Sequence, residues 1–198
     1  MFHTAGRAGR AALATTVSLA LVAALGACSD GGSDSDDGDA PEDSSEAAPA
    51  ITTKSTIGKI SGRLPREDRA QLRKKVTQAV DAWIDAAYVA GDYPRSDFSD
   101  AFKVFTKDAA ALAESDRRLM SNAAVGGRLE SVTAASRKLR IDVLAAKGKA
   151  VGVTGRFILV LDLDGEVRRT DRIVGRLFLS YQRGWQVFGY EVKRGRVA

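Results

Sequence analysis

The apolar residues after position 62 first follow a helical spacing. Between Pro65 and Gly91 they recur every three or four residues, as on one face of an α-helix. Proline is common at the start of helices and glycine just after their end, which fits these two positions. The pattern predicts one long amphipathic helix, and its apolar stripe comprises Leu72, Val76, Val80, Trp83, Ile84, Ala87 and Tyr88.

Two shorter helices are predicted after the loop that follows Gly91. The first begins near Ser96 and places Phe98, Ala101, Phe102 and Phe105 on one face. The second is rich in alanine and runs from about Thr106 to Met120. A segment with two adjacent glycines, residues 122–131, then separates the helices from the rest of the chain.

From Arg137 onward the apolar residues alternate with polar ones, which is the period of a β-strand. Strands are expected over residues 137–146, 150–164, 166–181 and 185–192, with hairpin turns at Asp164-Gly165 and Arg183-Gly184. Glycines inside these strands predict bulges or sharp bends. Helices followed by an antiparallel meander indicate an α+β fold, with the helices packed in a strongly curved antiparallel sheet.

The first 27 residues have the features of a signal peptide. Arg7 and Arg10 precede an apolar, uncharged run that is short for a membrane span and ends in small residues. The only histidine, His3, lies in this segment, so the remaining chain lacks the usual base of nucleophilic triads and the commonest transition-metal ligand. One cysteine, Cys28, excludes an intramolecular disulfide. We expect no metal and no cofactor.

The tetrapeptide Leu25-Gly26-Ala27-Cys28 resembles the lipobox of bacterial lipoproteins. The resemblance implies that the Cys28 thiol receives a diacylglycerol group and that a signal peptidase cuts just before it. The expected location is therefore the extracytoplasmic face of the cell membrane, with the lipid as anchor. The alternative is a free thiol in a secreted protein.

The residues after Cys28 are acidic, whereas the remainder of the chain is basic. Eight acids and no lysine or arginine lie in residues 29–50, which predicts a disordered tether; we place its end at residue 61 and the folded domain at 62–198. From residue 51 onward 28 basic and 17 acidic residues give a net charge of about +11. This charge indicates either a solvated surface or an anionic envelope component or protein as partner. Nucleic acid is not expected, since no nucleic-acid-binding motif is present.

The order of elements, together with the Trp-x-Val-x-x-Tyr pattern at residues 185–190, resembles the nuclear-transport-factor-2-like (cystatin-like) superfamily over residues 62–193. The organisation as a whole resembles an actinobacterial lipoprotein. In that superfamily the sheet forms a cone around an internal pocket. The resemblance makes Trp83, Tyr88, Phe102 and Tyr190 candidate pocket residues, although aromatic residues at helical spacing also fit a packed core.

Some members of the superfamily are isomerases or cyclases that use a pocket aspartate, and others only bind partners, so fold does not assign function. An enzyme of this type could use Asp142, Tyr88 and Tyr190 as its reactive groups. Asp142, however, lies between apolar neighbours in the sequence and faces away from the apolar side of the strand. We favour a non-catalytic binding or assembly module. A small-molecule isomerase or cyclase is the alternative.

Three arginines on the third predicted strand share one face because strand side chains alternate: Arg168, Arg172 and Arg176. Arg140 and Arg156 on neighbouring strands add to this face, and arginine forks suit carboxylate and phosphate groups. A solvated sheet face is the more common explanation of such residues. A homodimer through the sheet also remains open.

Replacing the predicted lipid acceptor tests the anchor. We expect Cys28→Ser to move the protein from the membrane to the soluble extracytoplasmic fraction, because serine cannot form the thioether. Fractionation followed by immunoblotting measures this, with Ser29→Ala as the control. Retention of Cys28→Ser in the membrane would contradict lipid attachment at this residue.

Overall fold

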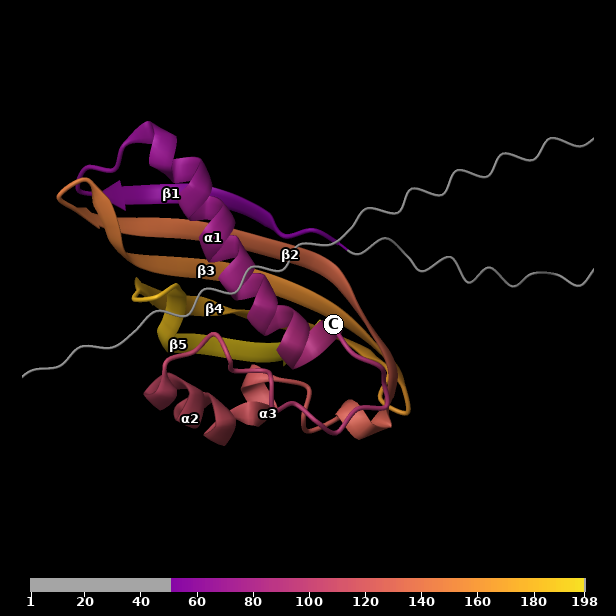
Figure 1. The fold of residues 1–198 in the computed structure, drawn as a ribbon. Coiled ribbons are helices and arrows are strands. Elements are labelled where there is room, and N and C mark those ends of the chain that lie inside the picture. The colour runs from indigo at the N-terminus through magenta and orange to yellow at the C-terminus, as the bar shows by residue number, and fades with distance from the viewer. Residues whose placement is uncertain (1–50, 198) are drawn as a thin grey trace, which may run out of the picture. The chain divides into compact units, whose positions relative to one another are not determined.

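The fold is α+β, built on a single mixed sheet. A computed structural model describes residues 51–197. Five strands lie in the order β1-β2-β3-β4-β5; β1 runs parallel to β2 and the other pairs are antiparallel (Figure 1). Their bounds are Lys54–Ser61, Leu129–Ala146, Lys149–Gly165, Arg169–Tyr181 and Trp185–Arg196. The predicted signal peptide, Cys28 and the acidic stretch lie outside the described residues.

Strand β1 corrects the predicted start of the folded domain. We expected residues 54–61 to belong to the tether, but they form a strand that pairs with β2. Thr53, just before this strand, is also held by the folded domain. The buried Thr53 hydroxyl donates a hydrogen bond to Asp81 Oδ1 of the long helix. The strand contains only two large apolar residues, Ile57 and Ile60, so its own pattern is weak. Its pairing with β2 stabilises it instead.

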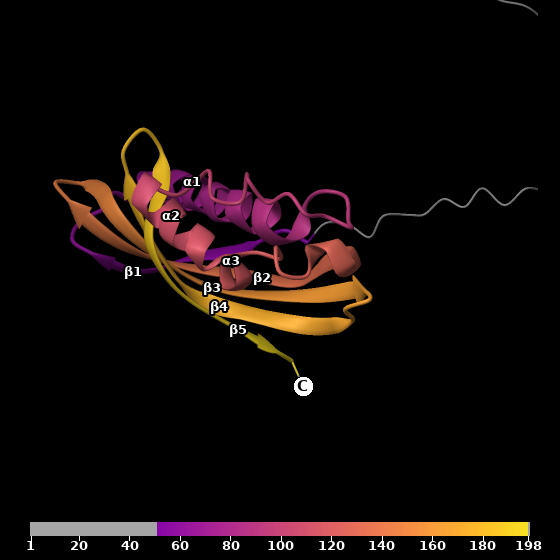
Figure 2. The same cartoon turned by 90° about the horizontal axis from the view of Figure 1, so that it is seen from below.

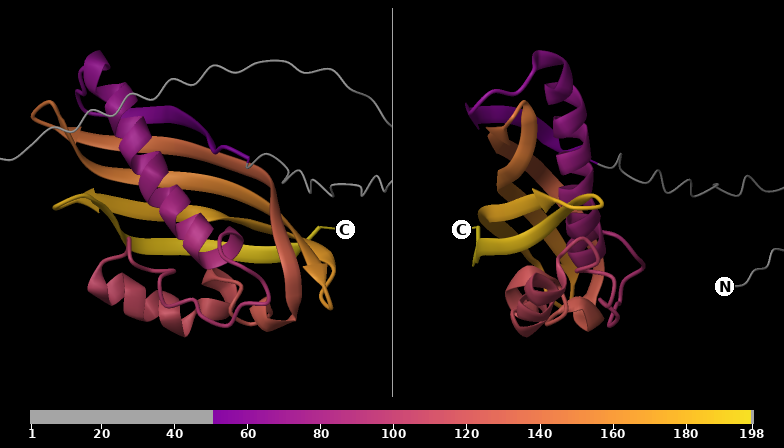
Figure 3. Two further views of the ribbon diagram at one scale, coloured as in Figure 1. Left: turned by 45° about the vertical axis from the view of Figure 1, so that its right-hand side comes forward. Right: turned by 60° about the vertical axis from the view of Figure 1, so that its left-hand side comes forward.

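The helices all lie on one side of the sheet (Figure 2). Helix α1 crosses the strands obliquely, as Figure 3 shows, and continues into a π-helical turn. The predicted second helix is wrong, because residues 99–104 form turns. The predicted third helix is interrupted at Asp116, whose ψ of 17° departs from helical geometry. The helical segments are α1 (Arg66–Ile84), η1 (Asp85–Val89), α2 (Lys107–Ser115), α3 (Arg117–Met120) and η2 (Gly126–Arg128).

The core lies between α1 and the face of the sheet that it covers, here called the inner face. Five buried apolar side chains of α1 fill this layer, and each contributes roughly 1.5–3 kcal/mol. Alternate strand residues meet them, including Ile141, Leu159 and Leu177, all fully buried. Their neighbours in the strands point to the opposite side, here called the outer face. No helix of the described residues covers the outer face.

A charged network is buried at the edge of the core. Asp171 on β4 is 2% exposed and accepts hydrogen bonds from Arg169 Nε and Arg194 Nε, both at 2.8 Å. Arg194 also donates to the Ser121 carbonyl and to Asn122 Oδ1. Burial opposes the charge of Asp171, but the hydrogen bonds from both arginines outweigh it and lower its pKa. The network joins β4 and β5 to the segment after α3.

Removing the carboxylate of Asp171 tests how much this network stabilises the fold. We expect Asp171→Asn to lower the free energy of unfolding by about 3 kcal/mol at pH 7, because Arg194 then lacks its buried partner. In the unfolded chain the pKa of an aspartate is about 4, and in the folded protein the pKa of Asp171 is lower. The ionised Asp171 therefore stabilises the folded state above about pH 4, and this stabilisation is lost as the pH falls through the folded-state pKa. The gap between the two proteins should therefore close below about pH 4.

Denaturant unfolding across pH measures this gap. Asp100→Asn is the control, since Asp100 forms an exposed ion pair with Lys103 that contributes at most about 1 kcal/mol. An Asp171→Asn protein as stable as the wild type at pH 7, or a gap that widens in acid, would contradict the role of the network.

Candidate functional site

The residues predicted to line an internal pocket are core residues instead. Trp83 and Tyr88 have no exposed surface, so no water-sized space touches either ring. Their polar atoms are satisfied by the backbone: Trp83 Nε1 donates to the Met120 carbonyl at 3.2 Å and the Tyr88 hydroxyl to that of Leu119 at 2.7 Å. Burial raises the pKa of Tyr88, which keeps its hydroxyl protonated.

The other two candidates are held in the same layer. Phe102 is 8% exposed and packs edge-to-face on Phe105, which also contacts Tyr190. The Tyr190 hydroxyl donates to Asp116 Oδ2 at 2.8 Å, and burial together with this carboxylate raises the pKa of Tyr190. Trp83, Tyr88 and Phe102 therefore belong to the packed core, and Tyr190 lies half-buried at its edge.

The outer face carries a line of three arginines across three neighbouring strands. The register pairs Arg140 on β2 with Arg156 on β3, and Arg156 with Arg176 on β4. Adjacent strands are about 4.8 Å apart, so these side chains are direct neighbours. We call Arg140, Arg156 and Arg176 the arginine row. Like charges directly opposite one another destabilise a sheet, so the row needs acidic partners.

Asp142 supplies the first of these partners. Its Oδ2 accepts a hydrogen bond from Arg156 Nε at 2.9 Å, and its Oδ1 lies 3.5 Å from Arg140 Nε. Oδ1 also accepts a hydrogen bond from the backbone N–H of Lys59, with an N···O distance of 2.9 Å. Burial opposes the charge of Asp142, but the hydrogen bonds from Lys59 and Arg156 outweigh it and lower its pKa. Asp142 is therefore an ionised side chain that orients two arginines.

A glycine on β1 makes this contact geometrically feasible. A Cβ atom at Gly58 would overlap Asp142 Oδ1 and approach Arg140 Nε, so only glycine leaves room for the carboxylate. The register of β1 against β2 also shifts between Ile57 and Ile60, which turns the Lys59 amide toward Asp142. At the far end of the row, Arg176 Nη2 donates to Glu191 Oε2 on β5.

The three arginines predicted from β4 alone do not act as one group. Arg168 precedes β4 and bonds Asp164 Oδ1 at 2.6 Å within the β3–β4 turn, so its predicted place on the strand is wrong. Arg172 lies on β4 opposite Val160 and forms no ion pair with any described residue. Only Arg176 of the three belongs to the arginine row.

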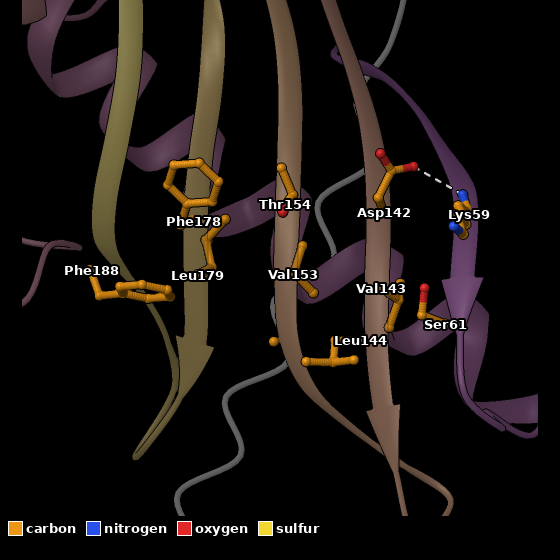
Figure 4. A pocket seen from close by; sticks show the side chains of 11 residues that line it. Lys59, Ser61, Asp142, Val143, Leu144, Val153, Thr154, Phe178, Leu179 and Phe188 are labelled. Carbon is orange, nitrogen blue, oxygen red and sulfur yellow. Dashed lines mark hydrogen bonds between the residues drawn. The ribbon is translucent and has the colours of Figure 1, made fainter.

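Apolar side chains lie directly beside the row. On one side Ile158 and Val174 are in register between Lys138 and Lys193. On the other side is a hollow of about 270 Å³, lined by Asp142, Thr154 and the apolar Leu144, Phe178 and Phe188 (Figure 4). Gly152 also lines this hollow and contributes no side chain to it. The outer face thus combines oriented cations with apolar contact area, the composition of a binding surface.

Sequence reasoning identified Arg140 and Arg156 as additions to a cationic face, and the register brings them together with Arg176. It missed the hollow and the role of Asp142, which depend on the pairing of β1, β2 and β3. The glycine in the β1 sequence was the one local signal for a close approach.

Comparison of the chain with models of known protein families, with curated proteins and with solved structures finds no match. Among residues 51–197 no helix is both long and apolar enough to cross a membrane. The same residues contain no cluster of three or more side chains of the types that hold metal ions.

Proposed function

We propose that this protein is a lipid-anchored extracytoplasmic lipoprotein whose domain binds an anionic partner through the outer face of its sheet. The arginine row carries the proposal, because it places three adjacent guanidinium groups on a sheet face that no described helix covers. The anchor rests on the signal-peptide pattern and on the lipobox at Cys28. The binding role rests on the geometry of the outer face.

The geometry of Asp142 favours an anionic ligand at the row. It engages Arg156 through Nε, and the Nη atoms of Arg156 form no hydrogen bond with a described residue. An arginine held in this way keeps its terminal donors for a second acid, and carboxylate or phosphate oxygens match that fork. The carboxylate of Asp142 orients the guanidinium groups before the ligand arrives, which lowers the entropic cost of binding.

Charge across the whole face favours the same type of partner. Four acids of the strands face outward, Asp142, Asp162, Asp164 and Glu191, against seven cations. Two copies meeting face to face would bring the excess of cations together, so the charge favours an acidic partner over a second copy of the chain. The outward cations are Lys54, Lys138, Arg140, Arg156, Arg172, Arg176 and Lys193.

The state of the candidate acids and bases supports a non-catalytic role. A general base works best with a pKa near the working pH, whereas the pKa of Asp142 is lowered. Tyr88 and Tyr190 use their hydroxyls in structural hydrogen bonds. We propose that the domain nevertheless belongs to the cone-shaped nuclear-transport-factor-2-like type, supported by its long helix against a four-stranded meander, and uses its outer surface rather than its interior.

Neutralising the row tests the binding role. We expect Arg140→Gln/Arg156→Gln/Arg176→Gln to weaken binding to immobilised heparin, used as a polyanionic probe, by at least about tenfold. The reason is that one hydrogen bond to a charged group is worth about 1.5 kcal/mol or more. Equilibrium binding across a salt series measures the change.

A matched control carries Arg66→Gln, Arg73→Gln and Arg118→Gln, three exposed arginines on the helices. It has the same net charge as the test protein and should bind heparin nearly as the wild type does. Equal weakening of both triple variants would show that net charge alone acts, and no weakening of the test variant would exclude the row. Thermal unfolding confirms that both variants are folded.

A further inference from the structure

Three segments meet at one end of the sheet, where β1 ends and the β2–β3 and β4–β5 hairpins turn. Figures 1 and 2 place these segments at the same end of the domain. We call residues 57–65, 143–155 and 177–190 the hairpin end. The β2–β3 turn is tight, with positive φ at Lys147 and Gly148, so the tip projects on two paired strands rather than on a long loop.

Exposed apolar side chains gather at the hairpin end. Seven large hydrophobic residues of the described chain are exposed, and four of them lie here: Leu144, Val151, Tyr181 and Phe188, each between 46% and 57% exposed. Trp185 adds a half-buried indole that packs edge-to-face on Tyr181, with ring centroids 5.6 Å apart. Scattered exposed apolar residues are ordinary, but a group of this kind indicates an interaction site.

The charge at the hairpin end has a single sign. Its three segments contain no aspartate or glutamate. The acids that border them on β2 and β5, Asp142 and Glu191, are held by the arginine row, and Glu67 and Asp68 belong to the first turn of α1. The cations of the three segments are Lys59, Arg63, Lys147, Lys149 and Arg183.

From these features we infer that the hairpin end contacts an anionic lipid bilayer. Tryptophan and tyrosine favour the membrane–water interface, and clustered lysines and arginines are attracted to anionic headgroups. Phe188 and Leu144 line the hollow on the outer face and offer apolar surface to acyl chains. A purely polar anionic partner would leave these side chains exposed to water, whereas a bilayer takes up both kinds of group.

The inference rests on the proposed anchoring, which brings the domain to a membrane. It also sets the orientation of the domain. Lys147, just beyond the end of β2, lies seven positions from Arg140, a distance of roughly 20 Å, so contact through the hairpin tips leaves the arginine row above the headgroups. The guanidinium groups of the arginine row therefore stay available to the proposed partner.

Tryptophan fluorescence tests the contact separately from the anchor. The chain has two tryptophans, and one of them, Trp83, is fully buried, so Trp185 reports on the hairpin end. The mature chain from residue 28 carrying Cys28→Ser, which bears neither lipid nor the predicted signal peptide, is mixed with phosphatidylglycerol–phosphatidylcholine vesicles whose acyl chains are brominated. We expect quenching that disappears in Trp185→Phe and is absent with pure phosphatidylcholine.

Paired variants in the same background identify the groups involved. Lys147→Gln/Lys149→Gln should weaken vesicle binding by about thirtyfold, and Leu144→Ser/Phe188→Ser by at least about tenfold. Lys74→Gln/Lys75→Gln and Leu112→Ser, equally exposed positions on α1 and α2, should change it less than about twofold. All substituted residues are exposed, so folding is preserved.

Unquenched Trp185 with phosphatidylglycerol vesicles overturns the lipid contact, as does equal loss of binding in the control variants. Either result leaves the anchor standing if Cys28→Ser still releases the native protein from the membrane. Conversely, quenching of Trp185 in a protein whose native form is not lipidated supports the contact and rejects the anchor.

Discussion

The guanidinium group of Arg194 fixes the segment that closes the inner face of the sheet. It bonds Asp171 within the sheet and reaches Ser121 and Asn122 just beyond α3. With that segment in place, the carbonyls of Leu119 and Met120 accept the polar atoms of Tyr88 and Trp83. The two largest aromatic side chains of the core are thereby satisfied and fully buried, and the space beneath α1 is filled.

Because the interior is filled, the outer face is the surface that we propose for molecular recognition. The positive charges on the outer face need acidic partners, because three arginines lie side by side on adjacent strands. Asp142 and Glu191 compensate the row from its two sides, and Gly58 leaves the space that Asp142 occupies. Two acids among three arginines leave an excess of positive charge with fixed orientation, which is the requirement for selective binding of an acidic group.

Helix α1 and the four antiparallel strands were predictable because the residues that face the core repeat at the periods of helix and strand. Strand β1 was not, since two isoleucines form too short a pattern and its partner lies about 80 residues away. The aromatic residues were identified correctly as interior, but residue type does not distinguish a filled core from a pocket wall. The hydrogen bonds of Trp83 and Tyr88 make that distinction.

The arginine row could not be predicted from the sequence, because it depends on the register between strands, which no local pattern contains. Which residues of β2, β3 and β4 lie opposite one another depends on irregularities between Ala134 and Ser136 and between Leu144 and Ala145. Arg168 shows the reverse error: the alternating pattern extended the predicted strand three residues too far toward the N-terminus, into a turn in which Arg168 bonds Asp164.

The central claim is that the domain recognises anionic groups through the arginine row. Arginine-specific covalent labelling, read by mass spectrometry with and without heparin, tests it most directly. The account predicts that heparin protects Arg140, Arg156 and Arg176 from the reagent and leaves Arg66, Arg73 and Arg118 on the helices as reactive as before. Protection confined to the helix arginines, or spread evenly over all six, would contradict it.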